Sequence, residues 1–423
     1  MLPRKCGQAE AIFARGGDMF HRALSVLILT LAVAGAVAGQ TAARLTLQSA
    51  LELADKQNLD LAAARRRRAV ALAGIQIARQ RPNPSVSFSA LRDTPHESLF
   101  FTQPLELGPK RQRRIEVARQ EGVLTEAEIA VLARLVRRST REAFYRALLA
   151  RAETERLAGV LRLTQRLKQI AQDRFEAGDV AQLEVIQADL EASRAQADFE
   201  VAQQREQVSM SQLNALLNEP ASTAWELTGG LAETLPDISQ EELFRRAANS
   251  NPELQRLAQE QKVEQSRRDL LKAERIPNLD LEFGADFNSP PDFRTGPRSQ
   301  VTLEMPLFTR NQGQIAQSVA SEQVFANEAA AAARAVQGRV DAGYLDFKAQ
   351  QTQVTLYRDR LLPVARQAEG LAEESYRAGK VGILAVIAAE RDVQEADRTY
   401  LDSLFTLQSL FAALEETVGE PLD

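Results

Sequence analysis

The feature that most constrains this chain is an internal duplication. The segment Arg174–Val180 matches Ser375–Val381 at a constant offset of 201 positions, and Glu219-Pro220 falls on Glu420-Pro421 at the same offset. Long stretches with few turn residues flank the glycine of each segment, so each copy predicts an antiparallel pair of helices closed by a glycine turn. At about 1.5 Å per residue, the longest of these helices would reach roughly 90–100 Å.

Composition agrees with long helices better than with a compact core. Aromatic residues make up only 5% of the 423 residues, and charged residues make up 26%. Such a composition is typical of helical rods and coiled coils. We therefore expect a mainly α-helical protein that consists of two similar halves.

The first residues have the pattern of a secretory signal. Met19–Arg22 leads into the apolar run Ala23–Val33, and Ala36-Val37-Ala38 offers a small-residue cleavage site. We expect residues 1–38 to be a signal peptide, with translation starting at Met1 or at Met19. The only cysteine, Cys6, lies in this leader, so the mature chain would have no thiol for a disulfide or a lipid anchor.

After the leader, the same order of elements occurs twice. We expect residues 39–219 to form a first repeat and residues 239–423 a second, joined by a linker at residues 220–238 that holds one short strand around Trp225–Thr228. Thr46 is the expected cap of the first short helix, and a capping box at Ser239-x-x-Glu242 opens its counterpart. Asn58 and Asn251-Pro252 interrupt these helices, and prolines end the helices that follow.

Each repeat also predicts one β-hairpin, at residues 84–105 and at residues 279–306. Polar and apolar residues alternate strictly in Ser85–Ala90, Leu279–Phe287 and Gln300–Met305, with Leu99–Gln103 as a weaker fourth strand and a long loop at Asn288–Arg298. A lone hairpin is not stable in water, and four strands are too few to close a barrel. Other copies of the chain must therefore supply further strands.

The alternation gives this sheet an apolar face and an acidic face. Because the helices offer no obvious cover for the apolar face, we expect lipid to cover it and the carboxylates to line a lumen. The residues expected to face lipid are Val86, Phe88, Leu281, Phe283, Val301 and Leu303. The carboxylates expected to face the lumen are Asp280, Glu282, Asp286 and Glu304.

Proline and charge add three expectations for the helices. Pro363 removes a backbone donor, which predicts a kink or break some three turns before the second glycine turn. The run Arg65–Arg68 is expected to be solvated or paired across helices rather than to form a binding patch. The run Lys110–Arg114 begins a helix, where the dipole disfavours positive charge, so lipid head groups or luminal carboxylates are its expected partners.

At this point the pattern resembles the TolC-like outer-membrane factors of bacterial efflux and secretion systems. The resemblance spans residues 45–421 and rests on Leu45–Leu51, on the duplicated helix–hairpin–helix order, and on Tyr376-x-x-Gly379 with Leu384-x-Val386-Ile387. It implies a homotrimer whose twelve strands, four from each chain, form one outer-membrane β-barrel that continues into a long periplasmic α-helical barrel. It also implies two partners, a periplasmic adaptor of the membrane fusion protein type and an inner-membrane pump.

The resemblance assigns roles to the tip turns at residues 173–180 and 374–381. In the family, an acidic residue six positions after the tip glycine helps to constrict the periplasmic entrance. Glu184 stands there after Gly178, with Asp179 or Gln187 as helpers, whereas Ala385 and Ala388 depart from the pattern in the second copy. The alternative reading is that Glu184 is simply an exposed helix residue. The residues implied to contact the adaptor are Arg174, Phe175, Gly178, Tyr376 and Gly379.

No catalytic constellation occurs in the sequence. The mature chain has one histidine, His96, and neither a P-loop nor a dinucleotide fingerprint, so we expect no enzyme activity, no cofactor and no metal site. The acidic net charge argues against nucleic acid as a partner.

We interpret the chain as a passive outer-membrane duct of a tripartite efflux system. An acidic lumen favours cations. The sequence before the second tip, including Leu361-Leu362-Pro363, is most similar to the heavy-metal branch of the family, which is CzcC-like or CusC-like. The alternatives are a duct for type I protein secretion, a periplasmic adaptor and a structural coiled-coil protein.

Overall fold

The computed structural model describes residues 43–422 except residue 292, so the expected signal at residues 1–38 lies outside the described residues. The chain divides into a small unit, which holds the segment up to Leu45 and Ala224–Thr228, and a large unit with the remainder. In the small unit, strand β1 (Ala43–Thr46) pairs with β4 (Trp225–Thr228). The sequence predicted β4 but not β1.

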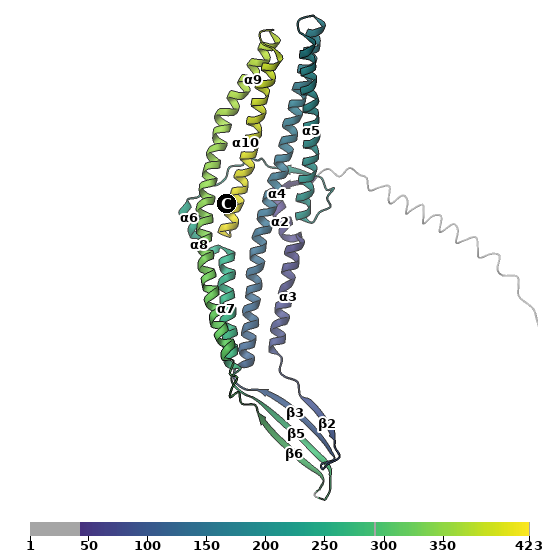
Figure 1. Cartoon of the computed structure of the whole chain (residues 1–423), viewed down its shortest axis with the longest axis vertical. Helices are drawn as coiled ribbons and strands as arrows, with labels where there is room; N and C mark the ends of the chain where they lie inside the picture. The colour runs from purple at the N-terminus through teal and green to yellow at the C-terminus, as the bar shows by residue number, and fades with distance from the viewer. Residues whose placement is uncertain (1–42, 292, 423) are drawn as a thin grey trace, which may run out of the picture. The chain divides into compact units, whose positions relative to one another are not determined.

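The large unit is mainly helical, as expected, and carries one small sheet (Figure 1). Its longest helix, α4, has 67 residues, which corresponds to about 100 Å. The first repeat contains α2 (Leu47–Gln57), α3 (Leu59–Arg79), α4 (Lys110–Glu176) and α5 (Gln182–Leu217). The second contains α6 (Gln240–Ser250), α7 (Pro252–Ala273), α8 (Gln312–Leu356), α9 (Leu362–Arg377) and α10 (Ile383–Val418).

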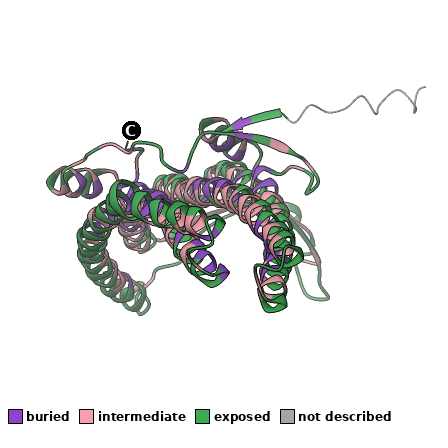
Figure 2. Ribbon diagram, turned by 90° about the horizontal axis from the view of Figure 1, so that it is seen from above, coloured by how far each residue is buried: buried purple, intermediate pink, exposed green. Residues whose placement is uncertain are grey.

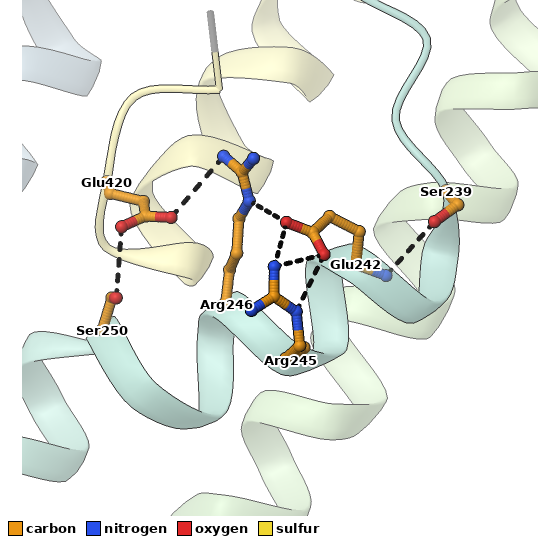
Figure 3. Close-up of polar contacts among 6 residues, drawn as sticks. All are labelled: Ser239, Glu242, Arg245, Arg246, Ser250 and Glu420. Carbon is orange, nitrogen blue, oxygen red and sulfur yellow. Dashed lines mark hydrogen bonds and ion pairs between the residues drawn. The ribbon is translucent and has the colours of Figure 1, made fainter.

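The two expected caps differ in how they form. Thr46 Oγ1 accepts from the Ser49 N–H at 3.2 Å and Ser49 Oγ accepts from the Thr46 N–H at 2.9 Å, which makes a complete capping box. Ser239 Oγ accepts from the Glu242 N–H at 3.3 Å. The Glu242 carboxylate, however, binds Arg245 and Arg246, each at 2.6 Å, so the box expected at Ser239 is only half formed (Figure 3). Two guanidinium groups offer charge-assisted hydrogen bonds that are stronger than a bond to one backbone N–H.

The asparagines at the two helix breaks make the same contacts in both repeats. Asn58 caps α3 through the Leu61 N–H and donates to the Leu216 carbonyl at 3.1 Å. Asn251 caps α7 through the Leu254 N–H and donates to the carbonyl of Thr417, the counterpart of Leu216, at 2.6 Å. Each break is therefore tied to the helix that returns from a tip.

The expected break near Pro363 is present. A short π-helical segment, Tyr357–Leu361, separates α8 from α9, and Pro363 lies in the first turn of α9. Since proline lacks an N–H and its ring clashes with the preceding turn, the helix widens there instead of continuing its regular hydrogen bonds.

The sheet is antiparallel, with strand order β2-β3-β5-β6. Its strands are β2 (Ser85–Ala90), β3 (Glu97–Glu106), β5 (Asn278–Ser289) and β6 (Phe293–Leu303). The prediction of a loop over Asn288–Arg298 was wrong, because β6 already begins at Phe293 and includes Pro297. An edge strand tolerates this proline, because one side of an edge strand needs no backbone donor. Glu304, which was expected within the strand, lies just after β6.

Side chains on the helices are largely exposed or half-buried, and the buried ones form narrow stripes (Figure 2). One buried cluster lies near the tip turns and draws on α4, α5, α9 and α10. Its members are Leu167, Ala171, Ala188, Tyr376, Ile383, Val386 and Ile387. Across the described residues, no helix has a run apolar enough to cross a membrane.

Candidate functional site

The two tip turns have the same backbone geometry. Gly178 and Gly379 have φ angles of +81° and +69°, a region that favours glycine. The Asp179 N–H donates to the Arg174 carbonyl at 2.9 Å, and the Lys380 N–H donates to the Ser375 carbonyl at 2.9 Å. Each pair of helices is thus closed by the same left-handed glycine cap.

The side chains at the tips are not equivalent. Tyr376 is 0% exposed, whereas Phe175, its counterpart in the first repeat, is 38% exposed. Arg174 Nη1 donates to the Tyr376 carbonyl at 3.3 Å, and its guanidinium carbon lies 5.0 Å from the centre of the Tyr376 ring. The counterpart of Arg174 is Ser375, so the second repeat offers Phe175 no such cation.

Glu184 contacts the same tyrosine. The Tyr376 hydroxyl donates to Glu184 Oε2 at 3.4 Å, which links α5 to α9. Burial, together with the Glu184 carboxylate, raises the pKa of Tyr376, so the phenol keeps the proton that it donates. Asp179 is exposed on the turn and Gln187 is half-buried, and in the described part of the chain neither of them binds Glu184.

The register of the sheet places the apolar residues on one face. Residues directly opposite each other share a face, and Val86 pairs with Phe101, which in turn pairs with Phe283. Leu281 pairs with Val301 on the same face. All six residues expected to face lipid lie there: Val86, Phe88, Leu281, Phe283, Val301 and Leu303.

The opposite face is polar, with serine and threonine side chains and several carboxylates. It carries Asp280, Glu282 and Asp286, and Ser98 Oγ donates to Asp286 at 2.7 Å. Arg298 shares this face: a guanidinium nitrogen lies 4.0 Å from an Asp286 oxygen, and the guanidinium carbon lies 5.1 Å from the centre of the Phe100 ring. Sequence reasoning missed Arg298 because it fell in the expected loop.

Both basic runs find partners within the chain. Arg65 pairs with Asp55 at 2.6 Å and Arg68 with Glu126 at 2.7 Å, so this run is paired across helices as expected. In the run at Lys110–Arg114, Arg114 has a carboxylate on the polar face of the sheet as a partner, as expected, whereas the partners expected for Lys110 and Arg111 were wrong. Arg111 and Arg114 donate to backbone carbonyls at the end of α3, Arg114 also pairs with Glu106, and Lys110 donates to Asn278. The negative end of the α3 dipole supplies this compensation.

A sheet that is apolar on one face and carries carboxylates on the other fits the strands of an outer-membrane channel, which alternate between a lipid-facing and a lumen-facing side. Comparison with protein families agrees with this class. The model of the family described as outer membrane efflux protein matches residues 50–219 and 243–420. The chain belongs to this outer membrane efflux protein family. Its location is therefore the outer membrane, with extension into the periplasm, and its role is that of an efflux channel.

Individual relatives support the same fold. The cobalt-zinc-cadmium resistance protein CzcC of Cupriavidus metallidurans is 26% identical over 388 residues, which cover 90% of this chain and 91% of that protein. The structure of CusC matches with a TM-score of 0.72 and 16% identity, covering 89% of this chain and 92% of the other. The outer membrane protein VceC from Vibrio cholerae matches with a TM-score of 0.73 and 17% identity, covering 89% and 97%.

Proposed function

We propose that three copies of this chain assemble into one exit duct, with a twelve-stranded barrel in the outer membrane and a helical barrel in the periplasm. The observation that carries this proposal is the sheet with two dissimilar faces. In the described chain, β2 and β6 each have a single neighbour, so both outer edges remain open for strands of other copies. Valine and phenylalanine side chains on one face suit lipid, and carboxylates on the other suit a wet lumen.

We further propose that the duct passes cations, with divalent heavy-metal ions as the cargo. Asp280, Glu282 and Asp286 outnumber Arg298 on the polar face, so the lumen of the barrel would be net negative. The name of the relative CzcC, a cobalt-zinc-cadmium resistance protein, supports metal cargo. Metal selection would belong to an inner-membrane pump, which a periplasmic adaptor connects to the tip turns through the exposed Phe175 and its neighbours.

Single-channel recording of the purified protein in planar bilayers tests this function. We expect stepwise conductance and, at neutral pH, a reversal potential that indicates preference for cations. The triple variant Asp280→Asn, Glu282→Gln, Asp286→Asn should lose this preference while it keeps a pore of similar size. Absence of conductance from a membrane-inserted trimer, or preference for anions in the wild type, would contradict the proposal.

We propose that the contacts of Tyr376 with Arg174 and Glu184, which we call the tip cluster, keep the periplasmic entrance narrow. Tyr376→Phe removes the hydrogen bond to Glu184, and Arg174→Ala removes the cation over the ring. Because each contact contributes about 0.5–1.5 kcal/mol, we expect the double variant to raise the open probability roughly tenfold or more. The matched control is Phe175→Ala, which alters the exposed counterpart of Tyr376 and should leave gating in the isolated channel unchanged. Equal open probabilities for the wild type, the double variant and Phe175→Ala would rule out this role for the tip cluster.

A further inference from the structure

The junction between the helices and the sheet concentrates positive charge. It consists of residues 79–82, 104–114, 269–278 and 304–312, which join α3, α4, α7 and α8 to the strands. These four segments carry nine Arg and Lys residues against four Asp and Glu, although the whole chain has a net charge of −5. An excess of positive charge at one place in an acidic chain indicates an anionic partner.

Part of this charge is compensated inside the protein. Glu106 pairs with Arg114 at 2.7 Å, and Asp269 lies 3.5 Å from Arg113. Lys272 also lies near Asp269, at 3.6 Å, and Lys110 and Arg111 are at least half-buried. The other four cations are arginines, which we call the junction arginines: Arg79, Arg81, Arg275 and Arg310. All four are exposed, and within the described residues none of them has a carboxylate at ion-pair distance.

Backbone contacts hold two of the junction arginines in place. Arg275 Nε donates to the Arg310 carbonyl at 2.9 Å, and Arg310 Nε donates to the Pro306 carbonyl at 3.1 Å. Each bond uses one of the five donors of a guanidinium group, so within the described residues the other four donors of each have no protein partner. Planar guanidinium groups with free donors bind phosphate in a bidentate manner.

Exposed apolar side chains lie directly beside these arginines. Phe308 is 91% exposed, and Met305 and Leu307 are also exposed. Met305 continues the row of Val301 and Leu303, which lies on the apolar face of the sheet. Phe308 is two residues from Arg310, so apolar surface and positive charge adjoin at the end of the apolar face.

We propose that the junction is a binding surface for anionic phospholipids of the membrane leaflet next to the helices. The phosphate group would bind the junction arginines, and the acyl chains would cover Met305, Leu307 and Phe308. This inference rests on the proposed placement of the sheet in the membrane. A headgroup with a net negative charge satisfies the uncompensated guanidinium groups, and the amphipathic order of the segment matches the order of a lipid from headgroup to chain.

Fluorescence quenching in vesicles tests the proposal. The chain has one tryptophan, Trp225. The variant Phe308→Trp adds a second, and subtracting the fluorescence of the wild type gives the fluorescence of residue 308 alone. The protein is reconstituted in phosphatidylethanolamine vesicles that contain either brominated phosphatidylglycerol or the same amount of brominated phosphatidylethanolamine. We expect the anionic lipid to be enriched at residue 308 by about threefold or more, and high salt to reduce the difference.

Two further variants, each made in the Phe308→Trp protein, test whether the junction arginines cause the enrichment of the anionic lipid. Arg79→Gln, Arg81→Gln, Arg275→Gln and Arg310→Gln together should abolish the difference between the lipids. The control carries the same change at four exposed arginines of the helices, Arg66, Arg67, Arg162 and Arg205, and should retain it. Equal quenching by both lipids in the Phe308→Trp protein with all four junction arginines intact would overturn the proposal, as would quenching by aqueous iodide alone, which would place residue 308 in water. Conductance measured on the same samples reports separately on the duct.

Discussion

We expect Glu390→Gln to abolish most of the loss of stability that the wild-type tip undergoes between about pH 5 and pH 8. Burial, together with a hydrogen bond to Glu369, raises the pKa of Glu390 to about 8. The folded chain then keeps a proton that the unfolded chain releases near pH 4.5. The free energy of unfolding therefore falls as pH rises through this window, by up to about 1.4 kcal/mol per pH unit, and levels off above it.

The surroundings of Glu390 explain why its charge is so unfavourable. The side chain is 6% exposed and lies beside a cavity of about 20 Å³, which has room for about one water molecule. Glu369 of α9 faces it, and two carboxylates in contact cannot both ionise without repulsion. Gln394 Nε2 donates to Glu390 at 3.1 Å and offsets only part of this cost.

The two neighbouring arginines each pair with another glutamate. Arg156 of α4 lowers the pKa of Glu390, but this arginine pairs with Glu153 at 3.2 Å. Arg391 lines the same cavity and pairs with Glu191 of α5 at 2.8 Å. Within the described residues neither arginine forms an ion pair with Glu390, so burial and the facing Glu369 favour its protonated form.

Thermal unfolding and hydrogen exchange of α9 and α10, each followed over a pH series, measure this effect. The wild type should become less stable and exchange faster at alkaline pH, after correction for intrinsic exchange rates, whereas Glu390→Gln should give a flatter profile. Glu374→Gln is the matched control, because Glu374 is an exposed glutamate of α9, the helix that carries Glu369. Parallel pH profiles for the wild type and Glu390→Gln would show that the pair holds no such proton.

Much of the fold was predictable because each repeat provides a check on the elements inferred in the other. A helix, break or turn inferred in one repeat has a counterpart 201 positions later, as at Gly178 and Gly379. Two strands did not follow from the sequence for physical reasons. Strand β1 has four residues and pairs with a segment about 180 positions away, so no local pattern indicates it. The start of β6 contains Gly296 and Pro297, which are typical of loops and are tolerated there because β6 is an edge strand.

The residue types of the site were predictable, but their pairing was only partly so. Alternation grouped the sheet residues into the same two faces that the strand register shows, since the period of a strand is two. The contact between Arg174 and Tyr376 joins the two repeats and has no local signal. Glu369 and Glu390 do carry one, because they lie at nearly equal distances before and after Gly379, and such positions face each other in an antiparallel helix pair.

The largest loss of stability is expected for Glu415→Ala. Arg141 of α4 and Glu415 of α10 form an ion pair whose side chains are only 7% and 6% exposed. Arg141 also stacks on Phe411, with its guanidinium carbon 4.8 Å from the ring centre. Removing the carboxylate leaves a buried guanidinium without its charge partner, which should destabilise the protein by about 3–5 kcal/mol.

Glu415 has a second role that its counterpart shares. Its Oε1 accepts from the Leu422 N–H at 3.2 Å. In the first repeat the same position is Asn214, which donates to the carbonyl of Ala221, the counterpart of Leu422, at 3.4 Å. Both side chains thus hold the segment that follows a long helix. We therefore expect a small residual loss, about 1 kcal/mol, whenever the Leu422 N–H loses this acceptor.

The double variant Arg141→Met, Glu415→Leu separates the ion pair from the packing. Arg141 Nε is buried and lacks a hydrogen-bond partner among the described residues, so the native pair is itself imperfectly satisfied. Apolar side chains of similar volume avoid the desolvation cost of both charges, and we expect the double variant to recover all but about 1–2 kcal/mol. Urea unfolding of the wild type, Arg141→Met, Glu415→Leu and the double variant, followed by circular dichroism, completes the thermodynamic cycle, and Glu415→Ala is measured beside them. If Glu415→Ala and the double variant lost the same stability, the penalty would come from packing in the α4–α10 contact, and a buried unpaired charge would not be its cause.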